Sequence, residues 1–294
     1  MSTMFPEYMI DLTHFSELRN LLKKYSVWAK KRLGQNFLVN KSVLEKIVET
    51  AEVHEGELIV EIGPGPGVLT QALLLAKAKV EAIEIDREIL PVLREATRSY
   101  SKFLTIFEKH ILDFDPPKEP YKIISNIPYH LTSPILRKFL SEVENRPSRI
   151  VLLVQKEVAE KICEKEGRDS HLSLMVKVFG VPEIIQIVRA ESFFPVPKVD
   201  SAILKIELFS EPKISIPPKV FEEMLFRGFA EPRKKIRNVL MKKFLKTSDQ
   251  IEEIFTKCNV SGDLRAQNLS IEDWENLAKV FFEEYIGQAV SNKQ

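Results

Sequence analysis

The chain has 294 residues, of which 44% are hydrophobic, and its formal net charge is +1. That is enough apolar material for a large core, and it predicts one large domain with a smaller one beside it. A net charge so close to zero gives no sign of a nucleic-acid partner, so any such partner must be argued from local patches of charge.

The two cysteines, Cys163 and Cys258, lie far apart and have no metal-ligand spacing, so no metal site is expected. Unpaired cysteines favour a reducing compartment. No apolar run approaches the roughly 20 residues of a membrane helix. The first residues lack the basic start and apolar centre of a signal peptide. These features predict a soluble cytoplasmic protein that does not bind a membrane.

From about residue 41 to 208, helix-like and strand-like stretches alternate. Apolar residues recur at helical spacing in 42–51, and 57–63 is a short apolar run typical of a buried strand. Further helices are expected at 68–78, 87–100 and 132–143, and further strands at 79–86, 102–107, 121–126 and 149–155. Thr132 or Ser133 is expected to cap the last of these helices. This order predicts an α/β fold with a Rossmann-like, mostly parallel sheet and helices on both faces.

The pattern changes after about residue 183. Strand-like stretches at 183–188 and 201–208 have no long helix between them, so they are expected to pair antiparallel at a sheet edge. Residues 210–218 are rich in proline and predict a linker. Beyond it only helical patterns follow, from 219–229 to 271–286. We therefore predict one domain over residues 1–208 and a small all-helical domain over residues 209–294.

A glycine turn, VEIGPGPGVLT, joins the first expected strand to its helix through Gly63, Gly65 and Gly67. Glycine allows a tight turn and lets a ligand approach the backbone. Glu84 ends the next expected strand, where a carboxylate can accept hydrogen bonds from ribose hydroxyls. The spacing is GxGxG and differs from the GxGxxG of dinucleotide binders. The pattern predicts a nucleoside cofactor, which at this point is either a dinucleotide or S-adenosylmethionine.

The sequence SNIPYH, residues 125–130, follows another expected strand. It should lie beside the glycine turn, because ligands of open α/β sheets bind beyond the carboxyl ends of the strands. The Asn126 side-chain oxygen and the Pro128 carbonyl can accept the N–H bonds of an exocyclic amine, while Tyr129 stacks on the base. The amine's lone pair is then directed at an electrophile. A dehydrogenase has no use for this group, so the turn favours S-adenosylmethionine over NAD.

Seven segments in order resemble the small-subunit ribosomal RNA adenine-N6 dimethyltransferases, which are relatives of the Erm methyltransferases and of mitochondrial transcription factor B. The resemblance runs from about Lys30 to Leu277. Its segments are KKRLGQNFL, VEIGPGPGVLT, EIDREI, SNIPYHLTSPIL, LVQKEVAEKI, FFPVPKVDSAIL and LRAQNLSIEDW. The cofactor implied by this resemblance is S-adenosylmethionine.

The resemblance also implies roles for single residues. Cofactor-binding residues would be Asn36, Leu38, Gly63, Gly65, Glu84, His110 and Asn126, and catalytic residues would be Asn126, Pro128, Tyr129 and Phe193. Phe193 would close over the target base opposite Tyr129; its alternative is a core position, because Phe194 follows it. His110 stands where the family usually has an aspartate that accepts from the adenine amino group. Its imidazole can accept through one nitrogen or pack on the adenine.

Two basic stretches predict contacts to RNA phosphates. Residues 227–246 carry eight basic side chains against one acid, Glu231, and residues 23–32 form the second stretch beside GQNFL. The residues expected to bind RNA are Lys30, Lys31, Arg32, Arg233, Lys234, Lys235 and Arg237. A solvated helix face is the alternative for either stretch alone. The family's QRRK is EPRK here, which removes one basic residue.

From the resemblance we expect an S-adenosylmethionine-dependent methyltransferase. Its implied substrate is a pair of adjacent adenosines in a loop near the 3′ end of small-subunit rRNA, each methylated twice on N6 during biogenesis of the subunit. We expect a monomer that acts on the immature small ribosomal subunit. Two alternatives stay open, namely Erm-type methylation of large-subunit rRNA and RNA binding without catalysis.

Overall fold

The structure is a computed structural model and describes residues 10–283. Its internal contacts divide the chain into two compact units. The first comprises Met1–Phe139, Val143–Ala159 and Pro182–Leu208, and the second comprises Leu140–Glu142, Glu160–Val181 and Phe209–Gln294. Residues 1–9 lie outside the described residues. They include the start of the N-terminal stretch that was expected not to be a signal peptide. Residues 284–286 of the last predicted helix also lie outside the described residues.

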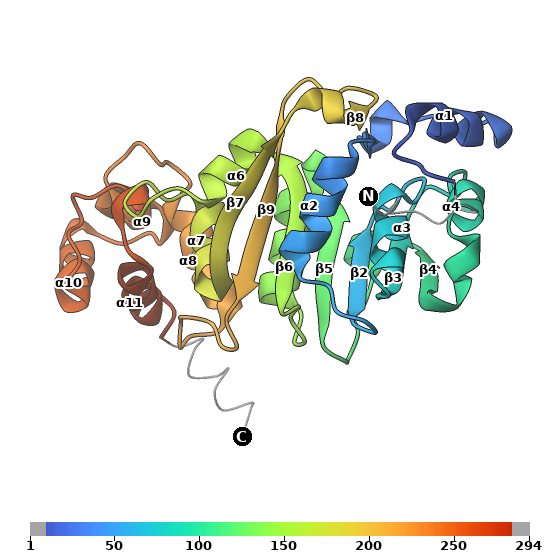
Figure 1. Cartoon of the computed structure of the whole chain (residues 1–294). Helices are drawn as coiled ribbons and strands as arrows, with labels where there is room; N and C mark the ends of the chain where they lie inside the picture. Colours follow the sequence, from blue (N-terminus) through green and yellow to red (C-terminus); the bar gives the residue numbers. More distant parts are fainter. Residues whose placement is uncertain (1–9, 284–294) are drawn as a thin grey trace. The chain divides into compact units, whose positions relative to one another are not determined.

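A seven-stranded sheet forms the centre of the first unit (Figure 1). Its spatial order is β4-β3-β2-β5-β6-β9-β7. The strands are β2 (Leu58–Ile62), β3 (Lys79–Glu84), β4 (Leu104–Glu108), β5 (Tyr121–Asn126), β6 (Arg149–Gln155), β7 (Gly180–Val188) and β9 (Ser201–Leu208). The strands from β2 to β6 pair in parallel, and β9 pairs antiparallel with β6. β7 is the edge strand, and β9 lies between it and β6 rather than at the edge itself.

The helices cover both faces of this sheet. Those of the first unit and its border are α2 (Lys41–Ala51), α3 (Val68–Leu75), α4 (Leu90–Ala96), α5 (Thr132–Arg137) and α6 (Lys156–Ile162). From β2 the chain moves through β3 to β4 in one direction, and from β5 to β6 in the other. Because crossovers between parallel strands are right-handed, α3 and α4 lie on the face opposite α5. The predicted Rossmann-like sheet with helices on both faces is confirmed.

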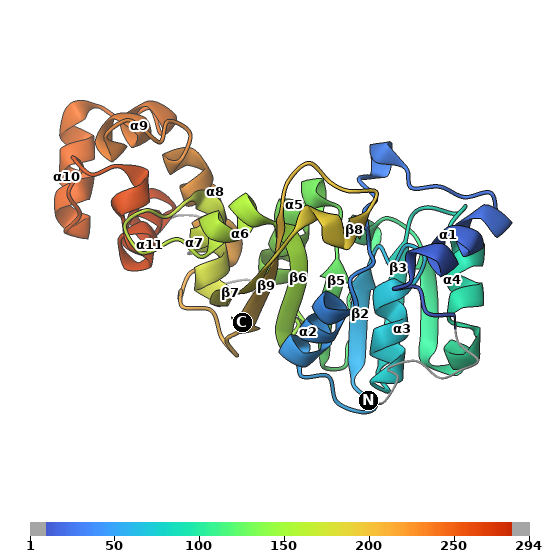
Figure 2. The same cartoon turned by 45° about the horizontal axis from the view of Figure 1, so that its top comes forward.

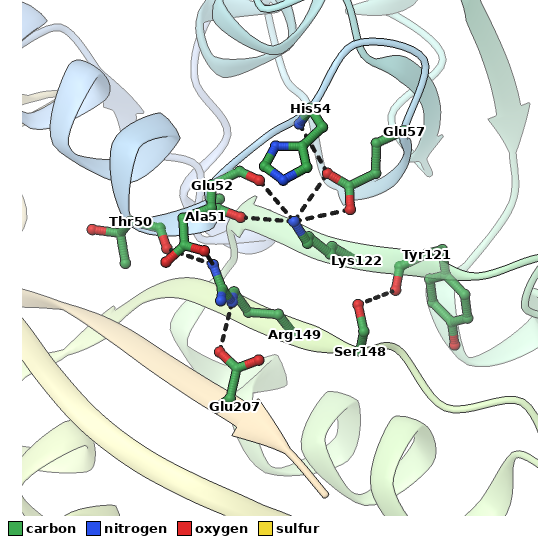
Figure 3. A network of polar contacts seen from close by, with 10 residues as sticks. All are labelled: Thr50, Ala51, Glu52, His54, Glu57, Tyr121, Lys122, Ser148, Arg149 and Glu207. Atoms are coloured by element: carbon green, nitrogen blue, oxygen red, sulfur yellow. Dashed lines mark hydrogen bonds and ion pairs between the residues drawn. The ribbon is translucent and has the colours of Figure 1, made fainter. Parts of the chain in front are cut away.

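The end of α2 is bound to the amino ends of β5 and β6 by two basic side chains (Figure 3). Lys122 Nζ donates to the carbonyls of Ala51 and Glu52, at 3.1 and 2.8 Å, and to the Glu57 carboxylate at 2.9 Å. Arg149 donates to the Thr50 carbonyl at 3.3 Å and pairs with the carboxylates of Glu52 and Glu207, at 3.1 and 2.7 Å. These cations satisfy carbonyls that the end of a helix leaves without partners.

The second unit is helical (Figure 2). Its helices are α7 (His171–Phe179), α8 (Pro218–Gly228), α9 (Ile236–Lys243), α10 (Ser248–Cys258) and α11 (Ile271–Phe281). Trp274 is fully buried in it, and Gly228 leaves the space for that ring, since a Cβ at Gly228 would lie 2.2 Å from it. The predicted division at residue 209 did not anticipate α7. Phe209 N–H donates to the Phe179 carbonyl, and α7 packs on α8, so α7 belongs to this unit.

Several short elements of the first unit were not predicted. They are α1 (Phe15–Lys24), β1 (Phe37–Leu38) and β8 (Phe193–Phe194), and β1 pairs antiparallel with β8. The predicted cap of the helix after SNIPYH was wrong. Leu131 occupies the N-cap position without a side-chain bond, and the Thr132 hydroxyl donates back to the Tyr129 carbonyl at 2.9 Å. Within residues 10–283 no helix has the length and apolar character needed to cross a membrane.

Candidate active site

A cavity opens where β2 and β5 separate at their carboxyl ends. Their backbone pairing extends only to Val60 opposite Ile123. Beyond that point the Ser125 hydroxyl bridges the strands, accepting from Ile62 N–H at 3.2 Å and donating to the Ile62 carbonyl. The strand order reverses here, which is the place where open α/β sheets bind ligands.

The cavity has a free volume of about 1050 Å³ with its open mouth included, which is enough for a nucleoside-sized ligand. Its wall comes from the loop before β1 and from the ends of β2, β3, β4 and β5. Among the predicted site residues it contains Asn36, Leu38, Gly63, Gly65, Glu84, His110, Asn126 and Pro128. The structure therefore brings together all seven residues that were expected to bind the cofactor. Within the described residues, no cluster of His, Cys, Asp and Glu could hold a metal ion.

The glycine turn and Glu84 form one side of this cavity. Gly65 has a φ of +57° and a Cβ there would meet the Phe37 ring at 3.0 Å, so both the conformation and the space require glycine. Gly65 N–H donates to one Glu84 oxygen at 3.1 Å, and Asp86 N–H donates to the other at 2.8 Å. Burial raises the pKa of Glu84, while these backbone bonds oppose the rise. Each carboxyl oxygen keeps a lone pair that can accept from a ligand.

Asn126, at the end of β5, has a fixed orientation. Its Nδ2 donates to the Asn36 carbonyl at 2.9 Å. This bond assigns the amide nitrogen to the loop before β1 and leaves Oδ1 without a partner among residues 10–283. The Asn36 carbonyl thus orients the Asn126 amide, whose Oδ1 is an acceptor of the kind that an exocyclic amine requires.

The next residues of SNIPYH lie partly in the cavity wall. The Pro128 carbonyl accepts from Leu131 N–H at 2.9 Å and keeps a second lone pair. Tyr129 is half-buried and outside the wall, and its hydroxyl is 2.7 Å from the Ser201 hydroxyl. Burial raises the pKa of Tyr129. Phe193 is 2% exposed, packs in the core of the first unit opposite Leu38, and does not line the cavity.

His110 lines the cavity, but its nitrogens are not equivalent. Nδ1 accepts from Leu112 N–H at 3.1 Å, as the N-cap of a short turn of 3₁₀ helix, Ile111–Asp113. In the neutral imidazole the proton then resides on Nε2, which makes Nε2 a donor. The nitrogen that was expected to accept from an adenine amino group is therefore already used by the backbone.

The sequence reasoning missed Glu61, which also lines the cavity. It lies in the middle of the buried strand β2 and is 2% exposed. Its Oε2 is buried and has no hydrogen-bond partner among the described residues. Burial raises the pKa of Glu61 to about 8; the Thr70 hydroxyl acts to lower this pKa, and the Glu84 charge adds a smaller rise. The available signal was an acidic residue inside an otherwise apolar strand, two positions before the glycine turn.

Some of the basic residues expected to contact RNA form ion pairs within the protein, and others are exposed without a recorded ion pair among the described residues. Lys30 forms ion pairs with Asp86 at 2.6 Å and Glu88 at 2.9 Å, and Lys31 and Arg32 are exposed. Gln35 accepts from Lys30 N–H and donates to Asp86, so Lys30 secures the loop that carries Asn36. The structure gives Lys30 this internal role, which the sequence did not indicate.

The second unit likewise contains both ion-paired and exposed members of the expected RNA-binding set. Lys234 pairs with Glu231, Lys235 with Asp263, and Arg237 with Glu252 and Asp263. Arg233 is exposed, and the structure records no ion pair for it, nor for Lys31 and Arg32, within residues 10–283. Acids that lie outside the basic stretch 227–246 in the sequence therefore balance only part of its charge.

Comparison with known proteins identifies relatives over most of the chain. A ribosomal RNA small subunit methyltransferase A from Dehalococcoides mccartyi is 33% identical over 277 residues, which cover 91% of this chain and 94% of the relative. One from Clostridium botulinum is 34% identical over 276 residues, covering 90% and 98%.

Two solved structures resemble this chain over most of its length. The 23S rRNA methyltransferase ErmE superposes with a TM-score of 0.65 at 29% identity, covering 83% of this chain and 98% of ErmE. A dimethyladenosine transferase from Plasmodium falciparum shares the fold, with a TM-score of 0.71 at 24% identity over 85% and 98%. A family model described as ribosomal RNA adenine dimethylase matches residues 27–283. The chain belongs to the ribosomal RNA adenine dimethylase family.

Proposed function

We propose that the cavity binds S-adenosylmethionine and that the protein transfers its methyl group to N6 of adenosine in rRNA. The wall fits a cationic nucleoside cofactor. Glu84 presents oxygens for ribose hydroxyls, the turn at Gly65 admits close approach to the backbone, and Glu61 supplies acidic character. The bound cofactor supplies an electrophilic methyl group, and the residues of this chain position the acceptor nitrogen.

The orientation of Asn126 is the observation that carries this proposal. With Nδ2 bound to the Asn36 carbonyl, Oδ1 accepts one N–H of the adenine amino group, and the Pro128 carbonyl accepts the other. Held by two acceptors, the nitrogen directs its lone pair at the methyl carbon. No strong general base is needed, because the nitrogen becomes acidic once it is methylated. Stabilisation by oriented dipoles in a water-poor site adds to this positioning.

Two rings are proposed to hold the target base. Tyr129 follows Pro128 directly and is half-buried, so it is the better placed of the two. Phe193 is core-packed opposite Leu38 and would have to expose its ring to stack on a base. A Tyr129→Ala variant should therefore lose more transfer than Phe193→Leu, measured by single-turnover kinetics at saturating cofactor.

The proposed substrate is the small-subunit rRNA, with two adjacent adenosines near its 3′ end each dimethylated on N6. The names of the relatives from D. mccartyi and C. botulinum support the small subunit. In this role the protein acts as a monomer on the immature subunit in the cytoplasm and takes part in its biogenesis. The proposed phosphate contacts are Lys31, Arg32 and Arg233, which are exposed and have no ion pair in the part of the chain that the structure describes.

The likeness to ErmE favours one second candidate, methylation of large-subunit rRNA. Assays with isolated immature small subunits and with protein-free large-subunit rRNA separate the two. Mass spectrometry of nucleosides, with isotope-labelled cofactor, should find N6,N6-dimethyladenosine in the small-subunit RNA. Label in the large-subunit RNA alone would contradict the proposal, and no labelled adenosine in either would favour RNA binding without catalysis.

A further inference from the structure

Glu61 is a buried carboxyl group that gives the proposed cofactor cavity acidic character but does not position the acceptor nitrogen. It lies on β2, directly before the glycine turn, and belongs to the cavity wall. The group that faces it from α3 is the Thr70 hydroxyl, which is itself without a hydrogen-bond partner in the described residues. From β3 it is faced by the Glu84 carboxyl. No cation is recorded near it within residues 10–283.

A carboxylate in such a place is unfavourable when the cavity holds no cation. Its Oε2 is buried, the Thr70 hydroxyl is the one group that offers it a donor among the described residues, and an ionised Glu84 would repel it. A proton on Glu61 removes both penalties, because a neutral carboxyl group is much cheaper to bury. A ligand with a positive charge in the same cavity reverses the balance, since it attracts the ionised form.

We propose that Glu61 holds a proton while the cavity is free and releases it when S-adenosylmethionine binds, so that its carboxylate balances the cofactor's positive charge. This inference rests on the proposed function, namely that the cavity binds this cofactor. The step changes only a protonation state: the O–H bond of Glu61 breaks and the proton goes to the solvent buffer. Cofactor binding is thereby linked to pH, and affinity falls about tenfold per pH unit below pH 8.

Isothermal titration calorimetry of S-adenosylmethionine, in two buffers with different protonation enthalpies, measures the protons released. The full chain should release about one proton at pH 7 and clearly less at pH 9. Glu61→Gln, which resembles the protonated form in shape, should bind with no release linked to this site and with an affinity independent of pH. Glu81→Gln is the matched control, because Glu81 is partly exposed on β3 and outside the cavity wall. It should keep the wild-type release.

Binding without proton release at pH 7, or equal release from Glu61→Gln and the wild type, would overturn the inference and leave the proposed function intact. Absence of binding to the wild type would overturn both. If Glu61→Gln fails to fold, as judged by thermal unfolding, the wild type still decides the matter. A Kd that does not change between pH 6 and 8 contradicts the inference.

Discussion

The two ends of the seven-stranded sheet differ in whether their polar side chains have hydrogen-bond partners. At the amino end, Lys122 and Arg149 are surrounded by carbonyl and carboxylate acceptors (Figure 3). At the carboxyl end, Asn126 Oδ1 and Glu61 Oε2 have no partner within residues 10–283. A buried polar group whose hydrogen bonds are all made stabilises the fold. A polar group at a cavity that lacks a hydrogen-bond partner is available to a ligand. We therefore expect substitutions at the amino end to change stability and those at the carboxyl end to change binding and transfer.

The largest effect is expected at the amino end. Lys122→Met leaves the Ala51 and Glu52 carbonyls and the Glu57 carboxylate without their common donor, and should lower the free energy of unfolding by about 4 kcal/mol. Urea denaturation measures this. Lys79→Met, at the exposed start of β3, is the control and should change stability by less than about 0.5 kcal/mol. A small effect of Lys122→Met would remove the distinction between the two ends.

At the carboxyl end of the sheet, Glu61 should make the ligand-free protein less stable as the pH rises. The pKa of Glu61 is raised to about 8, so the folded chain holds a proton that the unfolded chain loses above its pKa of about 4.5. The stabilisation is complete below pH 4.5 and is lost as the pH rises to about 8. It amounts to about 3 kcal/mol between pH 5 and pH 8. Denaturation across this range should show a loss of stability that is steeper in the wild type than in Glu61→Gln by this amount; parallel curves would contradict it.

Asn126→Ala removes the proposed acceptor of the adenine amino group and should slow methyl transfer at least about a hundredfold, or about 2.7 kcal/mol in barrier. Its stability should fall by no more than about 1 kcal/mol, because one hydrogen bond, to the Asn36 carbonyl, is lost. Asn145→Ala is the matched control at the amino end, where Nδ2 donates to the carbonyls of Pro117 and Glu119. That variant should lose about 1–2 kcal/mol of stability and keep its transfer rate. Full transfer by Asn126→Ala would exclude the proposed role of this amide.

The smallest predicted effect concerns His110. Because Nε2 is a donor, it suits the oxygen of a 6-oxopurine at least as well as adenine. His110→Asp replaces this donor with an acceptor for the adenine amino group. The variant's affinity for S-adenosylhomocysteine, relative to its affinity for the analogue with hypoxanthine in place of adenine, should exceed the wild-type ratio by about tenfold. That factor corresponds to one hydrogen bond. Calorimetric Kd values measure the ratio, and an unchanged ratio would show that His110 does not contact the base.

The sequence was sufficient for features that depend on local pattern. β5, β6 and β9 coincide with three predicted strands, because each has a short segment rich in apolar and β-branched residues. The seven expected cofactor residues meet in one cavity because strand ends and the glycine turn share an edge of the sheet. The predicted division at residue 209 left α7 in the first domain. Nothing in the local sequence pattern shows that residues 160–181 pack with the helical unit.

Features that depend on partners distant in sequence were not predictable. The eight cations of 227–246 suggested a strongly basic surface, but Glu252 and Asp263 neutralise part of it. Lys30 looked like an RNA contact, yet Asp86 and Glu88 bind it. The donor character of His110 was not predictable for a different reason: its partner, the Leu112 N–H, is only two residues away, but the fold determines the direction of that bond.

A crystal structure of the protein with bound S-adenosylhomocysteine would test directly whether this cavity is the cofactor site. We expect the ribose hydroxyls on the Glu84 carboxylate, the ligand along Gly63 and Gly65, and Asn126 Oδ1 facing the sulfur end of the cavity with Nδ2 still on the Asn36 carbonyl. A ligand bound outside this cavity, or an Asn126 amide turned away from it, would contradict the proposed function.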